Sequence, residues 1–449
     1  MSTPKAALEK IGAPLGVSID SLDFAELMDK QDVLAETRKL FVIPKLGTIP
    51  CETIGDPEQD CVYLLGNSLG LKPRKADKYM AEQLDAWGNK GIFMHTSGRV
   101  PAAYADDQPA KHIIASIVGA ADESEVGIMN GLTVNLHLLM LAFYKPQGTR
   151  NKIIIEDHAF PSDRYAVKSL MRVLGVSEDQ LIMLRPREGE YILQTQDILK
   201  VIEVEKDNLA LIMLPGVQYY TGQKLDMEAI TRVAVDLDIR IGWDLAHAVG
   251  NIQLKMHEWG ADFAVWCSYK YLNSGAGGIS GVFFHNKHHN NPPSHLQGWW
   301  SNKQETRFEM REIIDASVGA ETFRLCNPPP WLAALHLASL EIFKEVGMKK
   351  ILEKQFLLTG YLEHLLTLKF SDKLEILTPK NPAERGCQLS LVFRTKVEKV
   401  FARLQEKGVI CDLRGQVMRV APVPLYNTYK DVYMFTRILG ETLSAQNVL

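Results

Sequence analysis

The sequence predicts an α/β protein with a large domain, built on a mostly parallel sheet covered by helices, and a smaller α+β domain. Two observations support this. Between about Cys61 and His285, short β-rich runs alternate with segments of helical period. These runs are continuously apolar, which is typical of strands buried on both faces of a parallel sheet. At ~150 residues per domain, the 449 residues suffice for two or three domains.

The elements are predicted in chain order from their patterns. The first sixty residues are mostly helical, with an amphipathic stretch near Phe24–Phe41 that ends at Pro44. The strands of the large domain are then predicted at Val126–Met129, Lys152–Ile155, Leu209–Leu214, Ile239–Trp243, Ala261–Cys267 and Ile279–Phe284.

After the prolines at 328–330, one helix is predicted from about Trp331 to Lys344 and another from Lys350 onward. The last eighty residues then follow the order strand, strand, helix, strand, strand, helix, at Leu374–Leu377, Gln388–Phe393, Val397–Lys407, Val409–Asp412, Met418–Ala421 and Asp431–Leu443. We therefore place the large domain at residues 62–325 and a discontinuous smaller domain at 1–61 and 326–449.

Composition excludes several classes of partner. Fifty basic and 54 acidic residues give a net charge of -4, so neither nucleic acid nor an anionic membrane is expected as a partner. The six cysteines form no C-x-x-C pair and are too sparse for a disulfide scaffold. Apolar runs such as Leu209–Leu214 are far shorter than the ~20 residues of a membrane span, and no secretory signal is visible. We expect a soluble, cytoplasmic protein.

No metal site is expected either. His288 and His289 are adjacent, so they cannot share one helical face, and no carboxylate is spaced to join them. We interpret them as part of a solvated loop.

An aspartate and a lysine follow two consecutive predicted strands. Asp244 comes directly after Ile239–Trp243, and Lys270 follows Ala261–Cys267 in Ser268-Tyr269-Lys270. Ligands of open parallel sheets bind outside the carboxyl ends of the strands, so both side chains are expected in one crevice. The alternative for either residue alone is a structural ion pair or a loop cap.

The glycine-rich turn after the lysine favours the functional interpretation. The segment 273–278, Asn-Ser-Gly-Ala-Gly-Gly, lets the backbone approach a bound group closely. Trp266, Tyr269 and Tyr271 flank Lys270 with apolar surface, which suits an amine nucleophile. An Asp facing a pyridine nitrogen beside a Schiff-base Lys is the minimum that pyridoxal 5'-phosphate (PLP) chemistry requires of a protein.

Two segments are candidates for the phosphate. The segment 130–133, Asn-Gly-Leu-Thr, opens an apolar helix that runs through Phe143, and backbone N–H groups at a helix start suit a phosphate. The alternative is an ordinary turn capped by Asn130 or Thr133. In the second segment, 157–163, Phe160 could cover a planar ring and Asp163 could hold charge near it. The alternative here is that Phe160 is a core residue and Asp163 a helix cap.

The motifs together resemble those of the kynureninase family. The run Val265–Gly278 is similar to the family's Schiff-base segment. The others, in family order, are Leu64–Leu71, Phe160–Asp163, Tyr220–Gln223, Trp243–Gly250 and Arg419–Tyr426. The resemblance implies a fold-type I, aminotransferase class V-like PLP enzyme that is a homodimer with active sites at the subunit interface. It also implies hydrolysis of L-kynurenine or 3-hydroxy-L-kynurenine to an anthranilate plus L-alanine, in tryptophan catabolism.

The resemblance also implies roles for individual residues. Lys270 would form the Schiff base, Asp244 would pair with the pyridinium nitrogen near Asp163 and His247, and Tyr269 would protonate the substrate Cβ. The remaining cofactor contacts would come from Leu132, Thr133, Phe160, Pro161, Ser162, Tyr269, Trp299 and Asn327. Arg419 would bind the substrate carboxylate, while Ser68, His95 and Asn327 would line its aromatic end.

Two positions depart from the pattern of animal members. Pro215 stands where they usually have a serine, which removes one phosphate contact. Cys326 stands where they have a serine beside the asparagine, so the preference for the 3-hydroxylated substrate is open.

Two other classes of enzyme remain as alternatives. Another PLP enzyme, such as an aminotransferase or a cysteine desulfurase, could share the Asp and Lys, with Cys326 or Cys267 as the mobile thiol. Both cysteines are otherwise expected as small buried residues. The segment 66–70 matches G-x-S-x-G, so a serine hydrolase using Ser68 is a distant alternative, although the preceding strands of a hydrolase sheet are missing.

Overall fold

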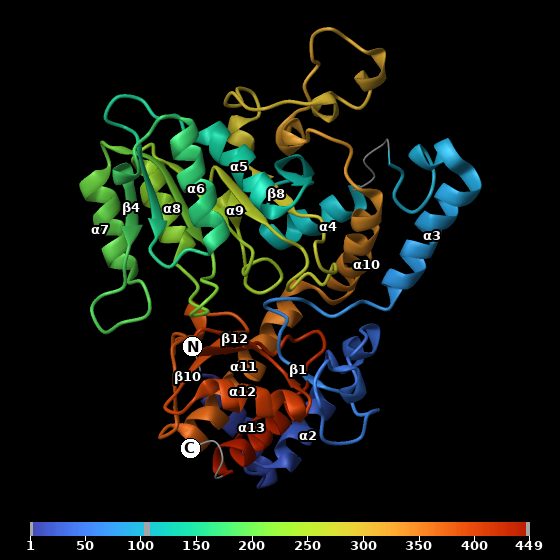
Figure 1. Ribbon diagram of the computed structural model, residues 1–449, viewed down its shortest axis with the longest axis vertical. Coiled ribbons are helices and arrows are strands. Elements are labelled where there is room, and N and C mark those ends of the chain that lie inside the picture. The colour runs from blue at the N-terminus through green and yellow to red at the C-terminus, as the bar shows by residue number, and fades with distance from the viewer. Residues whose placement is uncertain (1–2, 103–107, 446–449) are drawn as a thin grey trace. The chain divides into compact units, whose positions relative to one another are not determined.

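The computed structural model describes residues 3–102 and 108–445, and the chain divides into two compact units (Figure 1). Unit 1 comprises Met1–Arg74, Tyr219–Lys224 and Ile342–Leu449, and unit 2 comprises Lys75–Gln218 and Leu225–Glu341. Both boundaries come later in the chain than the sequence suggested. The second lies inside the helix α10 (Pro330–Val346), where no break in composition marks it.

Unit 2 is built on a seven-stranded sheet in the order β2-β8-β7-β6-β5-β3-β4. All neighbouring pairs are parallel except those that involve β8, which is antiparallel to both neighbours. The strands are β2 (Val126–Ile128), β3 (Lys152–Glu156), β4 (Leu181–Leu184), β5 (Leu209–Pro215), β6 (Arg240–Asp244), β7 (Phe263–Trp266) and β8 (Gly281–Phe284). The six predicted strands are confirmed. β4 was missed because its strand pattern is short and half-buried.

Helices cover both faces of this sheet. On one face, α5 and α6 pack against each other and share a core with alternate strand residues, such as Leu211 and Met213 of β5. The intervening Ile212 is also fully buried, so the other face is covered as well. Besides α10, the helices of unit 2 are α3 (Lys75–Lys90), α4 (Gln108–Val118), α5 (Leu132–Phe143), α6 (Pro161–Val173), α7 (Thr195–Glu205), α8 (Met227–Asp236) and α9 (Met256–Trp259).

The direction of Asp244 follows from strand alternation. A Cβ on Gly242 would collide with the ring of Phe263, which belongs to the core under α5 and α6. Side chains two positions apart on a strand point to the same face, so Asp244 points toward the face that α5 and α6 cover. Gly242 thus admits the Phe263 ring beside the residue that ends β6.

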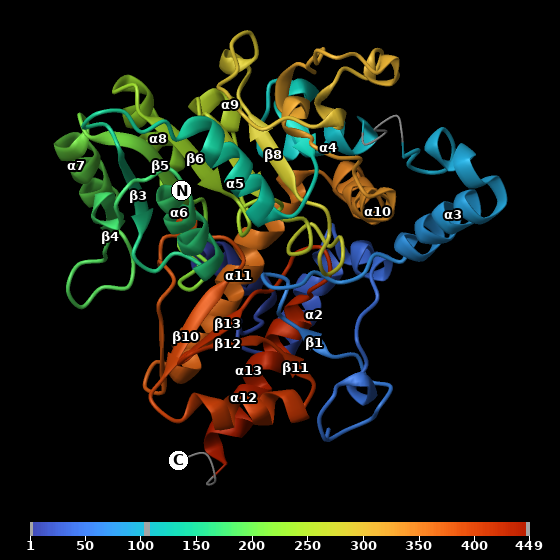
Figure 2. The ribbon, with the colours of Figure 1, turned by 45° about the horizontal axis from the view of Figure 1, so that its top comes forward.

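Unit 1 combines two small sheets with packed helices. Figure 2 shows β10, β12 and β13 side by side, in agreement with the antiparallel order β12-β13-β10-β9, whereas β1 and β11 form a separate parallel pair. The strands are β1 (Val62–Tyr63), β9 (Leu374–Ile376), β10 (Leu389–Phe393), β11 (Val409–Ile410), β12 (Asp412–Arg414) and β13 (Val417–Val420). The helices are α1 (Pro4–Gly12), α2 (Leu22–Gln31), α11 (Met348–Phe370), α12 (Val397–Glu406) and α13 (Tyr429–Ser444).

Two predictions in unit 1 were wrong in detail. The amphipathic stretch Phe24–Phe41 is not one helix: α2 ends at Gln31, where the Asp32 carboxylate accepts the Leu34 N–H and pairs with Lys354 at 2.6 Å. The predicted strand Val409–Asp412 is two strands, because β11 leaves to pair with β1.

The remaining short elements are 3-10 helices. They are η1 (Ala13–Leu15), η2 (Ala35–Leu40), η3 (Leu46–Thr48), η4 (Gly91–His95), η5 (Glu123–Glu125), η6 (Glu178–Gln180), η7 (Asn286–His288), η8 (Trp299–Ser301), η9 (Arg307–Glu309), η10 (Gly319–Phe323) and η11 (Pro382–Glu384). Within residues 3–102 and 108–445, no helix combines the length and apolar character needed to cross a bilayer.

Candidate active site

Asp244 and Lys270, the two residues predicted to act on the cofactor, both lie at the carboxyl ends of strands in unit 2. β6 ends at Asp244, which lies in register with Pro215 at the end of β5 and with Val265 of β7. Lys270 follows β7 after a turn of three residues. The two strand ends that were predicted to carry Asp244 and Lys270 therefore lie next to each other in the sheet.

Asp244 is held by backbone groups on both sides. Its Oδ1 accepts the Ala246 N–H at 2.8 Å, and its own carbonyl accepts the Gly216 N–H at 2.8 Å. The residue is buried, with 8% of its surface exposed. These bonds fix the carboxylate at the end of the strand.

Two further carboxyls share this buried edge. Burial, and then the charge of Asp244, raise the pKa of Asp163 well above its usual range, while the Lys270 ammonium opposes the rise. Burial likewise raises the pKa of Glu156 to about 8, with a further contribution from Asp244. A positive charge brought to this place would favour the ionised forms of Asp163 and Glu156, because an opposite charge nearby stabilises a carboxylate.

Lys270 and Tyr269 lie beside each other at this edge. The Lys270 Nζ is 5.9 Å from the centre of the Tyr269 ring, and both residues are half-buried. Burial, followed by the neighbouring Cys267, raises the pKa of the Tyr269 phenol far above its ordinary value. The phenol is therefore protonated at neutral pH and is able to donate a proton.

The turn after Lys270 is ordered from within. The Ser268 hydroxyl contacts the Ser274 hydroxyl and the Ile279 carbonyl, and all three groups are buried. Asn273 adopts a φ of +52° in the left-handed region, where its short polar side chain is tolerated. This buried network ties together the two ends of the turn that carries the lysine.

Two helix N-termini meet at one point. The Oγ1 of Thr133, in the first turn of α5, lies 2.6 Å from the Oγ of Ser162, in the first turn of α6. Neither helix has a side-chain cap, since Gly131 and Phe160 occupy their N-cap positions. The alternative interpretation, in which Asn130 or Thr133 caps the helix, is therefore wrong. Two uncapped helix starts with two hydroxyl groups form a site for an anion such as a phosphate.

The arrangement fits PLP. Oδ1 of the buried Asp163 has no hydrogen-bond partner among the described residues, which suits a group that this edge is built to receive. The carboxyls match a protonated pyridine nitrogen, Lys270 offers an amine, and the paired helix starts match the phosphate. This end of the sheet thus offers a matching group for the pyridine nitrogen, the aldehyde and the phosphate of the cofactor.

The other residues predicted to contact the cofactor lie in unit 2 and differ in their exposure and hydrogen bonds. Phe160 is 45% exposed and occupies the N-cap position before α6, so it is not a core residue, and Asp163 is a buried first-turn residue and not a cap. His247 is 6% exposed, and its carbonyl accepts the Asn251 amide. Trp299 is 44% exposed, with its indole N–H bonded to the Arg307 carbonyl.

Other predicted contacts are less buried. Leu132, Ser162 and Asn327 are half-buried, whereas Pro161 and His95 are exposed. Among the described residues, no hydrogen bond joins His95 or Asn327 to Lys270. Their contact with the aromatic end of the substrate stays a prediction.

Two predicted substrate contacts belong to unit 1. Arg419 on β13 is 2% exposed, pairs with the Asp412 carboxylate and donates to the Tyr219 carbonyl at 2.8 Å. Ser68 is half-buried, with its N–H bonded to the Leu65 carbonyl, in a turn that begins no helix. The strand-turn-helix context of a nucleophilic serine is therefore missing around Ser68.

Some features of the site escaped the sequence prediction. Glu156 lies at the end of β3, and the Gln218 amide reaches both its Oε1 at 3.4 Å and the His158 carbonyl at 3.2 Å. The available signal was a glutamate directly after an apolar strand, the same pattern that pointed to Asp244. Cys326 was expected to be buried but is exposed, because it precedes the prolines that open α10, whereas Cys267 is buried as expected.

A second cluster outside this edge has the composition of a metal site. Ligand atoms of Glu125, His257 and His285 lie within 4.8 Å of one another. Backbone donors already occupy Glu125, because Oε1 accepts the Asn286 N–H at 2.8 Å and Oε2 accepts the Ala121 N–H at 2.7 Å. We interpret the cluster as a structural anchor for the loops that meet there.

The sheet order, the lysine and the carboxyls at one edge define the class of fold-type I PLP-dependent enzymes. Over 457 aligned residues the chain is 43% identical to the kynureninase of Homo sapiens, in an alignment that covers 99% of this chain and 98% of the relative. The chain belongs to the kynureninase family.

Other comparisons agree with this assignment. The chain is 44% identical to the kynureninase of Myxococcus xanthus, over 94% of this chain and 97% of the relative. The family model of the kynureninase C-terminal domain matches residues 351–439. Among solved structures, the cysteine desulfurase CsdA from Escherichia coli is similar with a TM-score of 0.72 at 14% identity, over 93% of this chain and 99% of that one. At this identity the similarity shows the fold alone, so the desulfurase alternative is not favoured.

Proposed function

We propose that this protein catalyses the PLP-dependent hydrolysis of L-kynurenine, 3-hydroxy-L-kynurenine or both to the corresponding anthranilate plus L-alanine. In this reaction water adds across the bond between Cβ and the ketone carbon. The hydroxyl goes to the ketone carbon, which becomes the carboxyl of the anthranilate, and the proton goes to Cβ, which becomes the methyl group of alanine. The observation that carries the proposal is the pair of buried carboxyls, Asp163 and Asp244, with the half-buried Lys270 close enough to act on Asp163.

PLP, when bound, supplies an electron sink joined to the amino nitrogen of the substrate. Asp244 holds a proton on the pyridine nitrogen, because a carboxylate beside this nitrogen favours its charged form. Thr133 and Ser162 donate their hydroxyls, together with the N–H groups of two helix starts, to the phosphate. Phe160 covers the ring, while His247 and Trp299 complete the contacts.

Lys270 and Tyr269 move the protons. The Lys270 amine would take the proton from the substrate Cα. Tyr269 donates its phenol proton to Cβ, for which its raised pKa keeps it in the acid form. The 5.9 Å between the Lys270 Nζ and the Tyr269 ring supports a division of the two steps between neighbouring groups.

Arg419 binds the α-carboxylate of the substrate, for which a guanidinium offers two parallel donors. The Arg419 guanidinium pairs with Asp412, so a carboxylate of the protein already orients it. Ser68, His95 and Asn327 line the aromatic end of the substrate. Cys326, beside Asn327, places a thiol where a hydroxyl would favour a 3-hydroxylated ring.

We propose further that the enzyme is a homodimer with its active sites at the subunit interface. Exposed apolar side chains gather on α3 and η4, where Trp87, Ile92 and Phe93 are 61%, 72% and 68% exposed. Such a surface is typical of an interface. Light scattering after size exclusion, on the wild type and on Phe93→Glu, tests this: we expect a dimer that the substitution weakens.

The protein is also proposed to act in the cytoplasm. All six cysteines are free thiols, including the buried Cys61, Cys387 and Cys411, which suits a reducing compartment. Fractionation of cells that express the tagged protein tests this: enrichment with a cytosolic marker is expected.

One assay distinguishes the reaction from its alternatives. The purified holoenzyme is given L-kynurenine or 3-hydroxy-L-kynurenine, and release of the fluorescent anthranilate is followed together with L-alanine. Stoichiometric formation of both products supports the proposal. Transfer of the amino group to a 2-oxo acid, or sulfide release from L-cysteine without anthranilate formation, would overturn it in favour of another PLP enzyme.

A further inference from the structure

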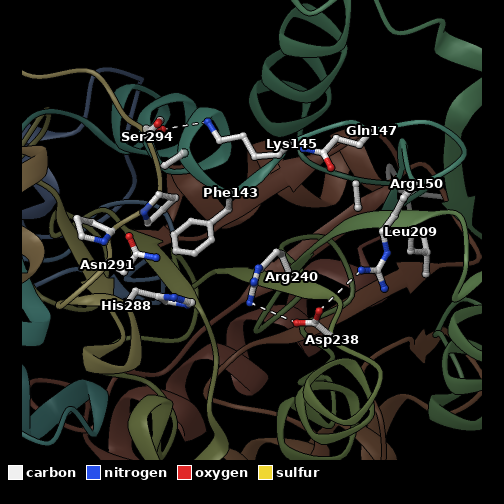
Figure 3. A pocket seen from close by; sticks show the side chains of 14 residues that line it. Phe143, Lys145, Gln147, Arg150, Leu209, Asp238, Arg240, His288, Asn291 and Ser294 are labelled. Atoms are coloured by element: carbon white, nitrogen blue, oxygen red, sulfur yellow. Dashed lines mark hydrogen bonds and ion pairs between the residues drawn. The ribbon is translucent and has the colours of Figure 1, made fainter.

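A polar cavity lies at the amino ends of β5 and β6 in unit 2, opposite the strand ends that carry the active site. Its volume is about 590 Å³, and it is lined by the end of α5, the turn 145–150, the start of β5, the turn between α8 and β6, and the loop 288–294 (Figure 3). Arg240 opens β6 on this side and Asp244 closes the strand on the other. At ~3.3 Å per residue, the two ends are about 13 Å apart, so this cavity is separate from the active site.

The charges that face this cavity are mainly positive. Lys145, Arg150 and Arg240 line it, and the opposing carboxylate in the lining is that of Asp238. The buried Asp262 also faces Arg240, with its Oδ1 3.6 Å from Arg240 Nη1. This carboxylate has closer partners, because His288 contacts its Oδ1 at 2.7 Å, Lys287 Nζ lies 3.0 Å from Oδ1, and the Ile241 N–H donates to its Oδ2 at 2.8 Å. His288 is thus a partner of Asp262 and not part of a solvated loop.

The Asp238 carboxylate lies between the guanidinium groups of Arg150 and Arg240, where the negative group of a ligand would bind. Arg150 Nη1 lies 3.9 Å from Asp238 Oδ2, and Arg240 Nη1 lies 3.8 Å from Oδ1, as the dashed lines in Figure 3 show. Both distances exceed those of a charge-assisted hydrogen bond, ~2.8 Å. The Asp238 side chain is 78% exposed, so it can move away at little cost. An anion that took its place would meet both arginines.

The third cation is held from the other side. Lys145 Nζ donates to the Leu141 and Ser294 carbonyls, each at 2.9 Å, and loss of hydration lowers its pKa. Carbonyl oxygens carry no net charge, so an anion nearby would offset this cost. The Lys145 charge is therefore available to a ligand.

The remaining lining is partly apolar. Pro292 and Pro293 form the loop side, whereas the lining residues Phe143 and Leu209 are almost fully buried, at 4% and 0% exposed. The volume falls within the ~300–1,000 Å³ of small-molecule sites. A ligand with a planar apolar body and one acidic group would use both kinds of wall.

We propose that this cavity is a second, non-catalytic binding site for a small organic anion, in which a phosphate or carboxylate contacts Arg150 and Arg240 and a planar apolar body lies along Pro292 and Pro293. Phosphate and carboxylate share the chemistry that a guanidinium recognises. The site does not depend on the proposed reaction, since none of its residues belongs to the active-site edge.

Binding to the PLP-loaded enzyme tests the proposal by calorimetry, with two probes that distinguish the sources of the acidic group. Adenosine monophosphate carries a phosphate and 2-naphthoate carries a carboxylate. Binding of either probe is expected to weaken about tenfold in Arg150→Gln and in Arg240→Gln, because a hydrogen bond to a charged group is lost. Arg240→Lys keeps the charge without the planar fork and is expected to bind with intermediate affinity.

Asp238→Asn provides a change of opposite sign. It removes the competing carboxylate, and asparagine tolerates the φ of +51° at this position, so binding is expected to tighten about threefold. Arg232→Gln on α8, whose arginine pairs with Glu228 and lines no part of the cavity, is the control and leaves the affinity unchanged. Binding of one probe alone, with these effects, supports the proposal and identifies the acidic group. No binding of either probe up to 10 mM (roughly the weakest affinity of interest), or binding that is equal in wild type, Arg150→Gln and Arg240→Gln, would overturn it.

Discussion

The hydroxyl oxygens of Thr133 and Ser162 lie 2.6 Å apart, each in the first turn of a different helix. This contact brings the N-termini of α5 and α6 together on the face of the sheet to which Asp244 points. A phosphate held there would lie on the same face as the carboxylate that serves the pyridine nitrogen. The contact therefore relates the two ends of a PLP molecule to one face of one sheet.

Thr133→Val removes one hydroxyl at nearly constant volume. PLP affinity of the cofactor-free protein is expected to fall about tenfold, and Ser162→Ala is expected to have a similar effect, because each removes a hydrogen bond to a charged phosphate. Titration of visible absorbance measures the affinity. Pyridoxal without its phosphate serves as the control ligand, and its affinity should stay constant. An equal loss for pyridoxal would contradict a phosphate role.

Lys270→Ala is expected to abolish turnover and the visible absorbance of the bound cofactor, because Lys270 provides the amine at this edge. The absorbance spectrum and anthranilate release are measured on the same preparation. Lys200→Ala, on the exposed surface of α7, is the control and keeps both properties. A yellow, fully active Lys270→Ala protein would refute the assignment.

Glu156→Gln tests the buried carboxyl cluster through the pH dependence of stability. The pKa of Glu156 rises from 4.5 in the unfolded chain to about 8 in the fold, so between these values the native state holds a proton that the unfolded state has lost. Stability of the cofactor-free wild type must then fall as pH rises from 4.5 to 8, by on the order of a few kcal/mol.

The glutamine side chain in this variant cannot ionise, so the variant should lack this part of the pH dependence. Urea unfolding at pH 5, 6, 7 and 8 measures the difference for both proteins. Parallel curves for wild type and Glu156→Gln would mean that Glu156 does not hold a proton in the native state.

Arg419→Ala is expected to raise KM for kynurenine at least tenfold, with a smaller effect on kcat, because the substrate carboxylate loses its partner. The same change leaves the Asp412 carboxylate without its buried cation, and stability falls for that reason. Asp412→Asn combined with Arg419→Ala removes the unpaired carboxylate charge. The double variant therefore separates the loss of stability from the loss of substrate binding. If the double variant recovers both stability and KM, Arg419 has only a structural role.

Cys326→Ser replaces the thiol beside Asn327 with a hydroxyl. A hydroxyl is a stronger hydrogen-bond partner than a thiol, so kcat/KM for 3-hydroxy-L-kynurenine relative to L-kynurenine is expected to rise about threefold. Competition between the two substrates in one reaction measures the ratio directly. An unchanged ratio would show that residue 326 does not contact the ring substituent.

The sequence by itself determined the strands, their apolar character and the order of the motifs. Lys270 and Asp244 were recognisable because each directly follows an apolar run, and the edge of a parallel sheet is where such residues must go. Local patterns of this kind depend only on neighbouring residues, which is why six strands of unit 2 were predicted within two residues.

The tertiary structure alone decided which distant residues share one environment. The charge of Asp244 raises the pKa values of Glu156 and Asp163 because the sheet order places β3 and β6 on either side of β5 and all three carboxyls are buried. Thr133 meets Ser162, and Asp238 lies between Arg150 and Arg240, for the same reason. A pKa or a cavity depends on burial and on distances across the sheet, and these are set by the packing of elements far apart in the chain.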